Sequence, residues 1–504
     1  MKRTLLAAFV ASAFVAGLAL RAVHGNSNAA PRAQTPPRLA LQPCKVPGVE
    51  EELLCGHLTV YENRRTMRGR QILLNVVVLP ALDAKAKAEP LFHIEGGPGN
   101  SATAEAREYA TVLKMYRRDR DVVLVDQRGT GGSNPLKCSS EGFDPQAFMD
   151  DMYPPAFVRD CRRALEQRAD LTQYTTSVAA DDLDDVRAAL GYERINLMGI
   201  SYGTRAAMEY VRRHPSHVRA VVLMGATPVF NKMPLYHARA AERAMELLFD
   251  DCAADAACRR AFPNLRAEFK RLIEKLERQP ARVLFKPKGA GREREFVVRR
   301  GFFADHVRSR MYLPPGAARV PYIIHRAALG DFGPFLSFAL PTRGPDPEDF
   351  SGGMYLSVTC SEDVPRIRPS EIEPLTKGTF LGDYRVFQQR RACKLWPKGD
   401  VPESFYEPVA ADAPVLIIAG RLDPVTPPEW ADQIARTLPN SKVVRVAADA
   451  HLPVGINFDC MDELIVRFID QAGTKGLDFD ACAAQIKFPP FQTEAAKAAG
   501  RASN

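Results

Sequence analysis

The segment Ile195-Asn196-Leu197-Met198-Gly199-Ile200-Ser201-Tyr202-Gly203 decides the fold. Its apolar start, Ile195 to Met198, predicts a buried strand, and Tyr202 to His214 predicts a helix. The residues between them match G-x-S-x-G, in which a serine sits on a tight, strained turn from strand to helix. That geometry lifts the hydroxyl above the edge of a sheet, so we predict that Ser201 is a nucleophile.

Strand and helix patterns alternate on both sides of this segment. Predicted strands are Gln71 to Leu79, Pro90 to Ile94, Asp121 to Val125, Val218 to Met224, Pro414 to Gly420 and Lys442 to Val446. Further helices are predicted at Ser177 to Leu190 and Met461 to Gln471. Such alternation is typical of an α/β protein with a mostly parallel sheet flanked by helices.

The alternation stops between residues 230 and 408, where helical stretches dominate. They are Ala238 to Phe249, Leu265 to Gln279 and Arg300 to Met311. We therefore expect a mainly helical lid, residues 230–408, inserted into a core that comprises residues 41–229 and 409–491, with residues 492–504 as a tail.

The N-terminus has the layout of a secretory signal peptide. Lys2 and Arg3 precede an apolar run from Leu5 to Leu20, and cleavage is predicted after Gly25. An uncleaved anchor is the alternative, but the run is short for a membrane span. Residues 26–40 should form a disordered leader. We expect an exported protein, periplasmic or extracellular, without stable membrane association after cleavage.

The charge distribution and the motifs argue against nucleic acid, metals and cofactors as partners. The formal charge of +8 falls to +5 without Lys2, Arg3 and Arg21, and no run of five like charges occurs. Aromatic residues do not interleave with the basic ones, so nucleic acid is a poor candidate partner. No metal-ligand set, P-loop or dinucleotide fingerprint is visible in the sequence, so we expect no metal and no cofactor.

Ten cysteines in an exported chain indicate disulfides. Sequence alone does not prove which residues pair. Five short loops that do not cross would pair Cys44 with Cys55, Cys138 with Cys161, Cys252 with Cys258, Cys360 with Cys393, and Cys460 with Cys482. A metal site or a catalytic thiol is disfavoured, because no CxxC pair is present and no cysteine stands at ligand spacing from a histidine.

A serine nucleophile needs a base, and in this fold the chain order is serine, acid, histidine. Asp423 follows the strand that ends at Gly420, and His451 follows the last predicted strand. We predict that Asp423 orients His451, which takes the serine proton. Asp449 is a weaker alternative acid.

The oxyanion of the tetrahedral intermediate needs hydrogen-bond donors. One is expected to be the amide of Tyr202. The second is assigned to Gly97, in the loop Gly96-Gly97-Pro98-Gly99 after an early strand. A plain tight turn is the alternative interpretation of that loop.

Four motifs together resemble the proline iminopeptidase and tripeptidyl aminopeptidase family of α/β-hydrolases. They are Gly96-Gly97-Pro98-Gly99, Asp126-Gln127-Arg128-Gly129-Thr130-Gly131, Gly199-Ile200-Ser201-Tyr202-Gly203-Thr204 and Leu422-Asp423-Pro424-Val425-Thr426-Pro427. The similarity runs from about Cys44 to Phe491. It implies a serine aminopeptidase that acts on a peptide or small-molecule substrate near a free N-terminus, with lid acids that hold the ammonium group.

The resemblance assigns that ammonium role to Glu362 and Asp363, in Cys360-Ser361-Glu362-Asp363. A structural salt bridge is the alternative. Where the family has His-Gly-Gly-Pro-Gly, this chain has His93-Ile94-Glu95-Gly96-Gly97, so Glu95 adds an acid near the oxyanion loop.

Two other functions stay open. An esterase for small acyl esters would use the same triad, and an apolar pocket without acids would favour it. A non-catalytic binding protein of the same fold is disfavoured by the complete set of serine, acid and histidine.

Overall fold

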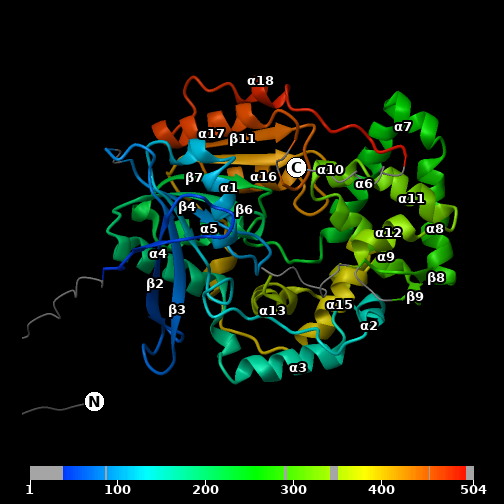
Figure 1. Cartoon of the computed structure of the whole chain (residues 1–504), viewed down its shortest axis with the longest axis horizontal. Helices are drawn as coiled ribbons and strands as arrows, with labels where there is room; N and C mark the ends of the chain where they lie inside the picture. Colours follow the sequence, from blue (N-terminus) through cyan, green and yellow to red (C-terminus); the bar gives the residue numbers. More distant parts are fainter. Residues whose placement is uncertain (1–37, 86–87, 289–291, 341–349, 453–454, 495–504) are drawn as a thin grey trace, which may run out of the picture. The chain divides into compact units, whose positions relative to one another are not determined.

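A nine-stranded sheet organises the structure, in the order β1-β2-β3-β5-β4-β6-β7-β10-β11 (Figure 1). The computed structural model describes residues 38–85, 88–288, 292–340, 350–452 and 455–494. The strands are β1 Gln42–Cys44, β2 Leu53–Tyr61, β3 Gln71–Leu79, β4 Leu91–Ile94, β5 Val122–Val125, β6 Ile195–Ile200, β7 Val218–Met224, β10 Val415–Gly420 and β11 Ser441–Val446.

The six strands from β5 to β11 in this order are parallel, whereas β1, β2 and β3 pair antiparallel at one edge. Strands β4, β5 and β10 are buried along their whole length. Parallel strands need this protection on both faces, because crossover helices cover them. The prediction of an α/β protein with a mostly parallel sheet is confirmed.

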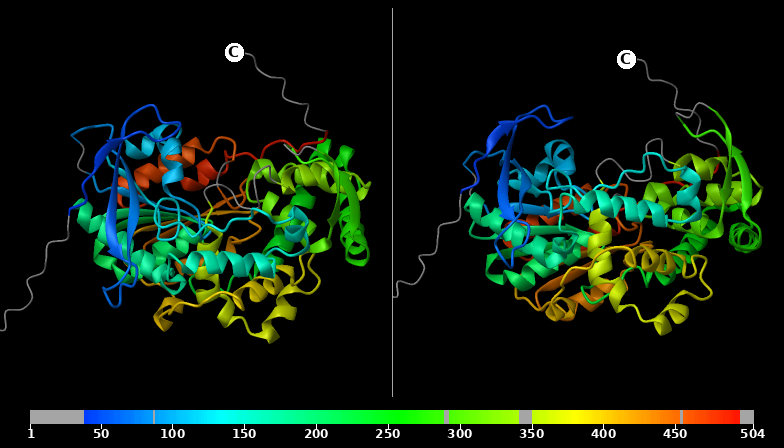
Figure 2. Two further views of the ribbon diagram at one scale, coloured as in Figure 1. Left: turned by 60° about the horizontal axis from the view of Figure 1, so that its bottom comes forward. Right: turned by 90° about the horizontal axis from the view of Figure 1, so that it is seen from below.

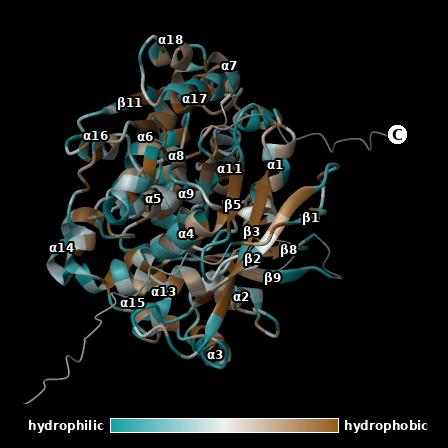
Figure 3. Cartoon of the chain, turned by 90° about the vertical axis from the view of Figure 1, so that its left-hand side faces the viewer, coloured by the Kyte–Doolittle hydropathy of each residue, from teal (hydrophilic) through white to brown (hydrophobic). Residues whose placement is uncertain are grey.

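Helices pack on both faces of the sheet. On one face, Leu197 of β6 joins a core with α4 Thr176–Leu190 and α5 Tyr202–Arg213. On the other, Met198 joins a core with α1 Ala106–Ala110 and α17 Asp459–Gln471. Successive side chains of a strand point to opposite faces, so adjacent residues of β6 pack into the two cores on either side of the sheet. Figure 3 shows the strands β3 and β5 in the brown of hydrophobic residues.

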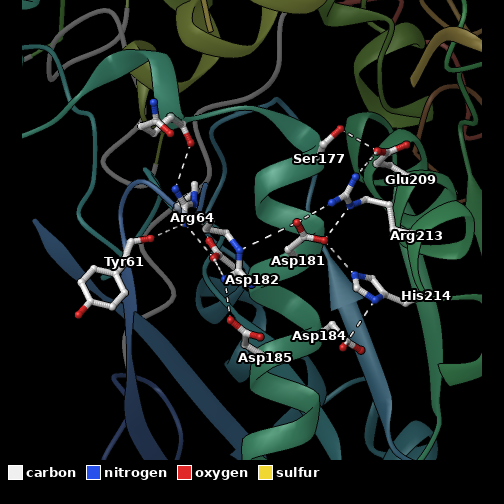
Figure 4. Close-up of polar contacts among 12 residues, drawn as sticks. Tyr61, Arg64, Ser177, Asp181, Asp182, Asp184, Asp185, Glu209, Arg213 and His214 are labelled. Carbon is white, nitrogen blue, oxygen red and sulfur yellow. Dashed lines mark hydrogen bonds and ion pairs between the residues drawn. The ribbon is translucent and has the colours of Figure 1, made fainter. Parts of the chain in front are cut away.

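The aspartates of α4 form ion pairs with neighbouring elements (Figure 4). Buried Asp182 accepts from Arg128 Nη2 at 2.8 Å and from Arg64 Nη1 at 2.9 Å. Asp181 accepts from Arg213 Nε at 2.7 Å and contacts His214 Nε2 at 3.0 Å. These ion pairs connect α4 to the turn after β2 and to α5. Helix α5 begins directly after Ser201.

The segment between β7 and β10 is mainly helical. Its helices are α6 His237–Ala254, α7 Ala256–Ala261, α8 Leu265–Arg278, α9 Arg300–Arg310, α10 Pro314–Ala317, α11 Val320–Ala328, α12 Gly333–Ala339, α13 Gly352–Glu362, α14 Pro369–Thr376 and α15 Tyr384–Cys393. Helices α6, α8, α9, α11 and α12 lie together in Figure 1 and share a core that includes Phe303 and Phe335. Helix α13 instead packs into the core of the sheet.

The same segment holds a hairpin that the helical pattern did not predict, β8 Ala281–Phe285 with β9 Arg294–Val298. In both views of Figure 2 this hairpin lies on the opposite side from β2 and β3. Two more helices, α2 Pro145–Asp150 and α3 Pro155–Glu166, precede α4.

All ten cysteines form disulfides, in the five pairs that sequence order suggested: Cys44–Cys55, Cys138–Cys161, Cys252–Cys258, Cys360–Cys393 and Cys460–Cys482. The predicted signal peptide and residues 26–37 of the leader lie outside the described residues. Among the helices that are described, none has the length and apolar character that a membrane span requires.

Candidate active site

Ser201 occupies the strained turn between β6 and α5. Its φ of 55° and ψ of −120° are rare for a residue with a side chain. A Cβ on Gly203 would overlap the carbonyl oxygen of Ile94, and a Cβ on Gly199 would overlap the carbonyl group of Gly203. These close backbone approaches explain why the motif needs glycine on both sides of the serine.

The serine hydroxyl meets a histidine and an acid from distant parts of the chain. His451 Nε2 lies 2.8 Å from Ser201 Oγ, and His451 Nδ1 lies 2.8 Å from Asp423 Oδ2. Asp423 and His451 are 0% and 2% exposed. The backbone amide of His451 donates to the carbonyl oxygen of Tyr312 at 3.0 Å, which fixes the loop after β11. This geometry allows the serine to pass its proton to the histidine.

Asp423 is held by its own turn. Its Oδ1 accepts from the amides of Val425 and Thr426 at 2.7 and 2.8 Å, while its Oδ2 accepts from Thr426 Oγ1 at 2.6 Å. The alternative acid, Asp449, is also buried, and its Oδ1 accepts from the amide of Ala450 at 3.3 Å. The structure therefore brings Asp423 to the ring of His451, as expected from chain order.

The serine opens into a cavity of about 840 Å³, within the usual size range of ligand pockets. Gly97, Pro98, Ser201, Tyr202 and His451 all line it. Tyr202 is the first residue of α5, so its amide has no carbonyl partner one turn back in the helix. Gly97 has a φ of 106°, a conformation that favours glycine, which lets its loop turn beside the serine.

Carboxylates dominate the charged groups of the described cavity lining. Six acids line it, namely Glu95, Glu105, Glu108, Asp363, Asp459 and Asp462, against the two guanidinium groups of Arg205 and Arg385. Burial raises the pKa of Asp462 to about 6 although Tyr116 donates to it, and burial with the charge of Glu95 raises the pKa of Glu105. Such a lining attracts cations.

Glu95 lines the cavity next to the loop Gly96-Gly97-Pro98-Gly99, as its sequence position suggested. Its Oε1 is 2.8 Å from His93 Nε2, and its Oε2 accepts from the amide of Gly96 at 2.9 Å. Burial acts to raise the pKa of Glu95, but the contacts with His93 and Gly96 outweigh it, so the net pKa is lowered. The side chain is therefore an ionised acid at neutral pH, in the cavity that Ser201 also lines.

Glu362 and Asp363 occupy different surroundings. Asp363 lines the cavity, and both of its oxygens accept from Arg205 Nη1 at 3.0 Å. Glu362 is not among the lining residues, and it accepts from the amide and hydroxyl of Thr176 at 2.6 and 2.8 Å. The Thr176 hydroxyl also contacts the Tyr202 hydroxyl at 2.8 Å. An internal salt bridge is therefore part of the role of Asp363, whatever else it binds.

Burial raises the pKa of Glu362 from 4.5 to about 7, in spite of the nearby charge of Arg205 and the bonds from Thr176. Between these two pKa values the unfolded chain has lost a proton that the folded protein retains. The contribution of Glu362 to the free energy of unfolding therefore falls as pH rises through this window. We expect Glu362→Gln to flatten the decline in stability between about pH 5 and about pH 8.

Urea unfolding of the wild type and the variant at both pH values measures this difference. Glu373→Gln, an exposed glutamate on α14, is the matched control and should keep the wild-type dependence. An equal decline in the wild type and in Glu362→Gln would contradict the expectation.

Several cavity residues come from the helical segment and carried no motif that could identify them. They are His237 at the start of α6, Tyr312 after α9, Tyr355 on α13 and Arg385 on α15. Tyr312 follows a helix and the other three lie in helices, so only the folding of that segment over the sheet brings all four to the serine.

One group in the described part of the chain has metal-ligand spacing, with Asp184, His214 and His217 atoms within 4.8 Å of one another. Sequence spacing did not reveal it, because α4 supplies Asp184, whereas His214 and His217 lie in the segment that follows α5. Asp184 already accepts from Arg187 Nε and the Tyr210 hydroxyl at 2.7 and 2.8 Å. These bonds, and the cation of Arg187, leave the group poorly suited to a metal ion.

The sequence is similar to those of known hydrolases. Residues 89–260 match the alpha/beta hydrolase fold family, and residues 379–480 match a family described as TAP-like protein. The chain is 25% identical to tripeptidyl aminopeptidase of Streptomyces coelicolor over 468 residues, which cover 84% of this chain and 82% of that protein.

Two further relatives are similar over shorter stretches. Serine protease Hip1 of Mycobacterium tuberculosis is 30% identical over 50% of this chain and 52% of its own. A probable proline iminopeptidase of Streptomyces coelicolor is 30% identical over 27% of this chain and 32% of its own. The chain is therefore a serine hydrolase with the α/β-hydrolase fold, and its sequence is similar to those of tripeptidyl aminopeptidases and proline iminopeptidases.

Proposed function

We propose that this protein is an exported serine aminopeptidase that hydrolyses peptide bonds near a free N-terminus, of the tripeptidyl or prolyl type. The observation that carries the proposal is the acidic lining of the cavity at Ser201, because an ammonium group is the cation that such a substrate presents. The names of the relatives favour the same chemistry. The five disulfides and the N-terminal sequence support export.

In the proposed reaction, His451 removes the proton of Ser201 as its oxygen attacks the carbonyl carbon of the scissile bond. The amides of Gly97 and Tyr202 stabilise the oxyanion. The intermediate collapses to an acyl-enzyme when His451 protonates the leaving amine. Water then repeats the sequence, with His451 as base, and releases the N-terminal product. Asp423 holds the imidazole in the tautomer that accepts the serine proton.

Glu95 and Asp363 are the proposed partners of the substrate ammonium, since both line the cavity. Glu362 lies behind them and supports the site through Thr176 and Tyr202. The helical segment, residues 230–408, acts as a lid that closes the cavity and supplies part of its wall.

We expect the purified mature protein to cleave aminoacyl, prolyl or tripeptidyl chromogenic amides with a free amine and to spare their N-acetylated forms. Glu95→Gln should raise KM for the free-amine amides about tenfold, the worth of one charge-assisted hydrogen bond. Glutamine can still accept from the Gly96 amide, so turnover of p-nitrophenyl acetate should stay unchanged.

Glu141→Gln, an exposed glutamate that does not line the cavity, serves as the control. If the protein hydrolysed p-nitrophenyl acetate but none of the free-amine amides, the aminopeptidase proposal would be wrong, and an esterase for small acyl esters would be favoured. A parallel loss of ester turnover in Glu95→Gln would mean that Glu95 shapes the oxyanion loop and does not bind the ammonium.

A further inference from the structure

A buried cluster of the helical segment, formed by Asp305, Arg308 and Arg385, holds one carboxylate against two guanidinium groups, and its Arg385 lines the cavity. Asp305 lies between two guanidinium groups, accepting from Arg308 Nε at 3.0 Å and from Arg385 Nη1 at 3.5 Å. The side chains of Asp305, Arg308 and Arg385 are only 9%, 3% and 13% exposed. One carboxylate thus pairs with two guanidinium groups. Because the cluster is buried, water does little to screen the charges of these groups.

The other guanidinium of the described lining does not share this property. Arg205 meets both oxygens of Asp363 at 3.0 Å and has Glu362 at 3.8 Å, so its charge is fully offset. Arg385 differs from Arg205 because it shares its carboxylate with Arg308. Among the described residues its other hydrogen bonds go to neutral groups, the Tyr355 hydroxyl at 3.0 Å and Met152 Sδ at 2.9 Å.

His237 also comes from the helical segment and has unused hydrogen-bonding capacity. It is 5% exposed, it lines the cavity, and neither of its ring nitrogens has a hydrogen-bond partner among the described residues. Nε of Arg385 also lacks a partner there. Burial lowers the pKa of His237, and the charges of Arg308 and Arg385 lower it further, so the ring is neutral with one N–H to donate.

We propose that Arg385 and His237 form a subsite for a carboxylate group of the substrate. A carboxylate would supply the missing negative charge and accept charge-assisted hydrogen bonds from the guanidinium, with a further one from the imidazole. This inference rests on the proposed function and adds a substrate class to it, namely short peptides that carry a carboxylate close to the cleaved bond.

The subsite adjoins the catalytic histidine through Tyr312. The Tyr312 ring packs edge-on against His451, with centroids 5.0 Å apart, and its hydroxyl accepts from Arg308 Nη1 at 2.8 Å. Acids of the core, such as Glu95 and Glu105, line the same cavity. A substrate with an ammonium and a carboxylate group thus finds a complementary charge for each.

The carboxylate has two sources, the C-terminus of a short peptide and an acidic side chain. To separate them, we would compare a free pentapeptide with its C-terminal amide, and a glutamate-containing amide with its glutamine counterpart. Mass spectrometry of competing pairs gives the ratio of kcat/KM. For the pair that matches the true source of the carboxylate, the wild type should show a kcat/KM about 10- to 100-fold higher for the member that carries the carboxylate.

Arg385→Gln should bring that ratio close to one, whereas Arg391→Gln should keep it. Arg391 lies on the same helix, pairs with Asp151 at 2.7 Å and does not line the cavity. His237→Asn leaves the cluster of Asp305, Arg308 and Arg385 intact. It should lower the ratio of kcat/KM between the carboxylate member and its neutral counterpart, and it provides a test even if Arg385→Gln fails to fold.

Equal kcat/KM for both members of both pairs in the wild type would overturn the subsite and leave the aminopeptidase intact. Titration of the Ser201→Ala protein with the same peptides measures the preference without turnover. If no peptide is cleaved but the carboxylate members still bind about tenfold more tightly, the subsite stands and the proposed reaction fails. Equal binding there would overturn the subsite independently of catalysis.

Discussion

Ser201→Ala should lower kcat for a free-amine amide by about a millionfold, to the level that binding and the oxyanion donors alone provide. Alanine removes the oxygen that lies 2.8 Å from His451 Nε2, so no acyl-enzyme can form. The backbone at this position is strained with either side chain, and the loss should therefore appear in catalysis while the fold is retained. Active-site titration and steady-state kinetics measure it.

The control for this variant is Ser309→Ala, which removes an exposed hydroxyl on α9 that donates to the carbonyl oxygen of His306. It should keep wild-type turnover. If Ser201→Ala retained a large share of the activity while Ser309→Ala behaved as expected, the nucleophile would be another group and the proposed mechanism would fail.

Asp423→Asn should lower kcat by about ten-thousandfold with little change in structure. The two oxygens of Asp423 have separate tasks, since Oδ1 accepts from the Val425 and Thr426 amides and Oδ2 contacts His451 Nδ1. Asparagine can keep its oxygen toward the amides and turn its NH2 group toward the ring. Nδ1 must then accept, Nε2 carries the proton, and the histidine cannot take a proton from Ser201.

Asp449→Asn distinguishes the two acids that follow the later strands. Asp449 is buried two residues before His451, so its replacement tests general disturbance of the same loop. We expect kcat to stay within about tenfold of the wild type, because the ring tautomer is unaffected. A ten-thousandfold loss in Asp449→Asn, with Asp423→Asn active, would reverse the assignment. Circular dichroism and thermal unfolding of both variants control for folding.

Local patterns in the sequence were enough to predict the strands that carry the site. The predicted strands Gln71–Leu79 and Val218–Met224 agree with β3 and β7 at every residue, and the predicted Ile195–Met198 lies within β6. Each of these strands contains a short apolar run, so it could be recognised without reference to its neighbours. The antiparallel β1 and β2 were missed because their half-exposed residues lack such a run.

Chain order likewise indicated which acid and histidine could meet the serine, because the C-terminal ends of parallel strands gather at one edge of the sheet. Serine, acid and histidine each follow such a strand, so their contact is a consequence of topology. The G-x-S-x-G spacing reflects backbone crowding around a single turn, which is also a local property.

The charge balance of the cavity, by contrast, depended on tertiary packing. Arg205 and Asp363 are 158 residues apart, and Arg385 and Asp305 are 80 residues apart. Whether a carboxylate is offered to substrate or bound to an arginine depends on such distant neighbours, as do the burial and pKa of each group. The reaction class could therefore be inferred from local sequence, whereas the charges that select a substrate emerged only when the helical segment packed over the sheet.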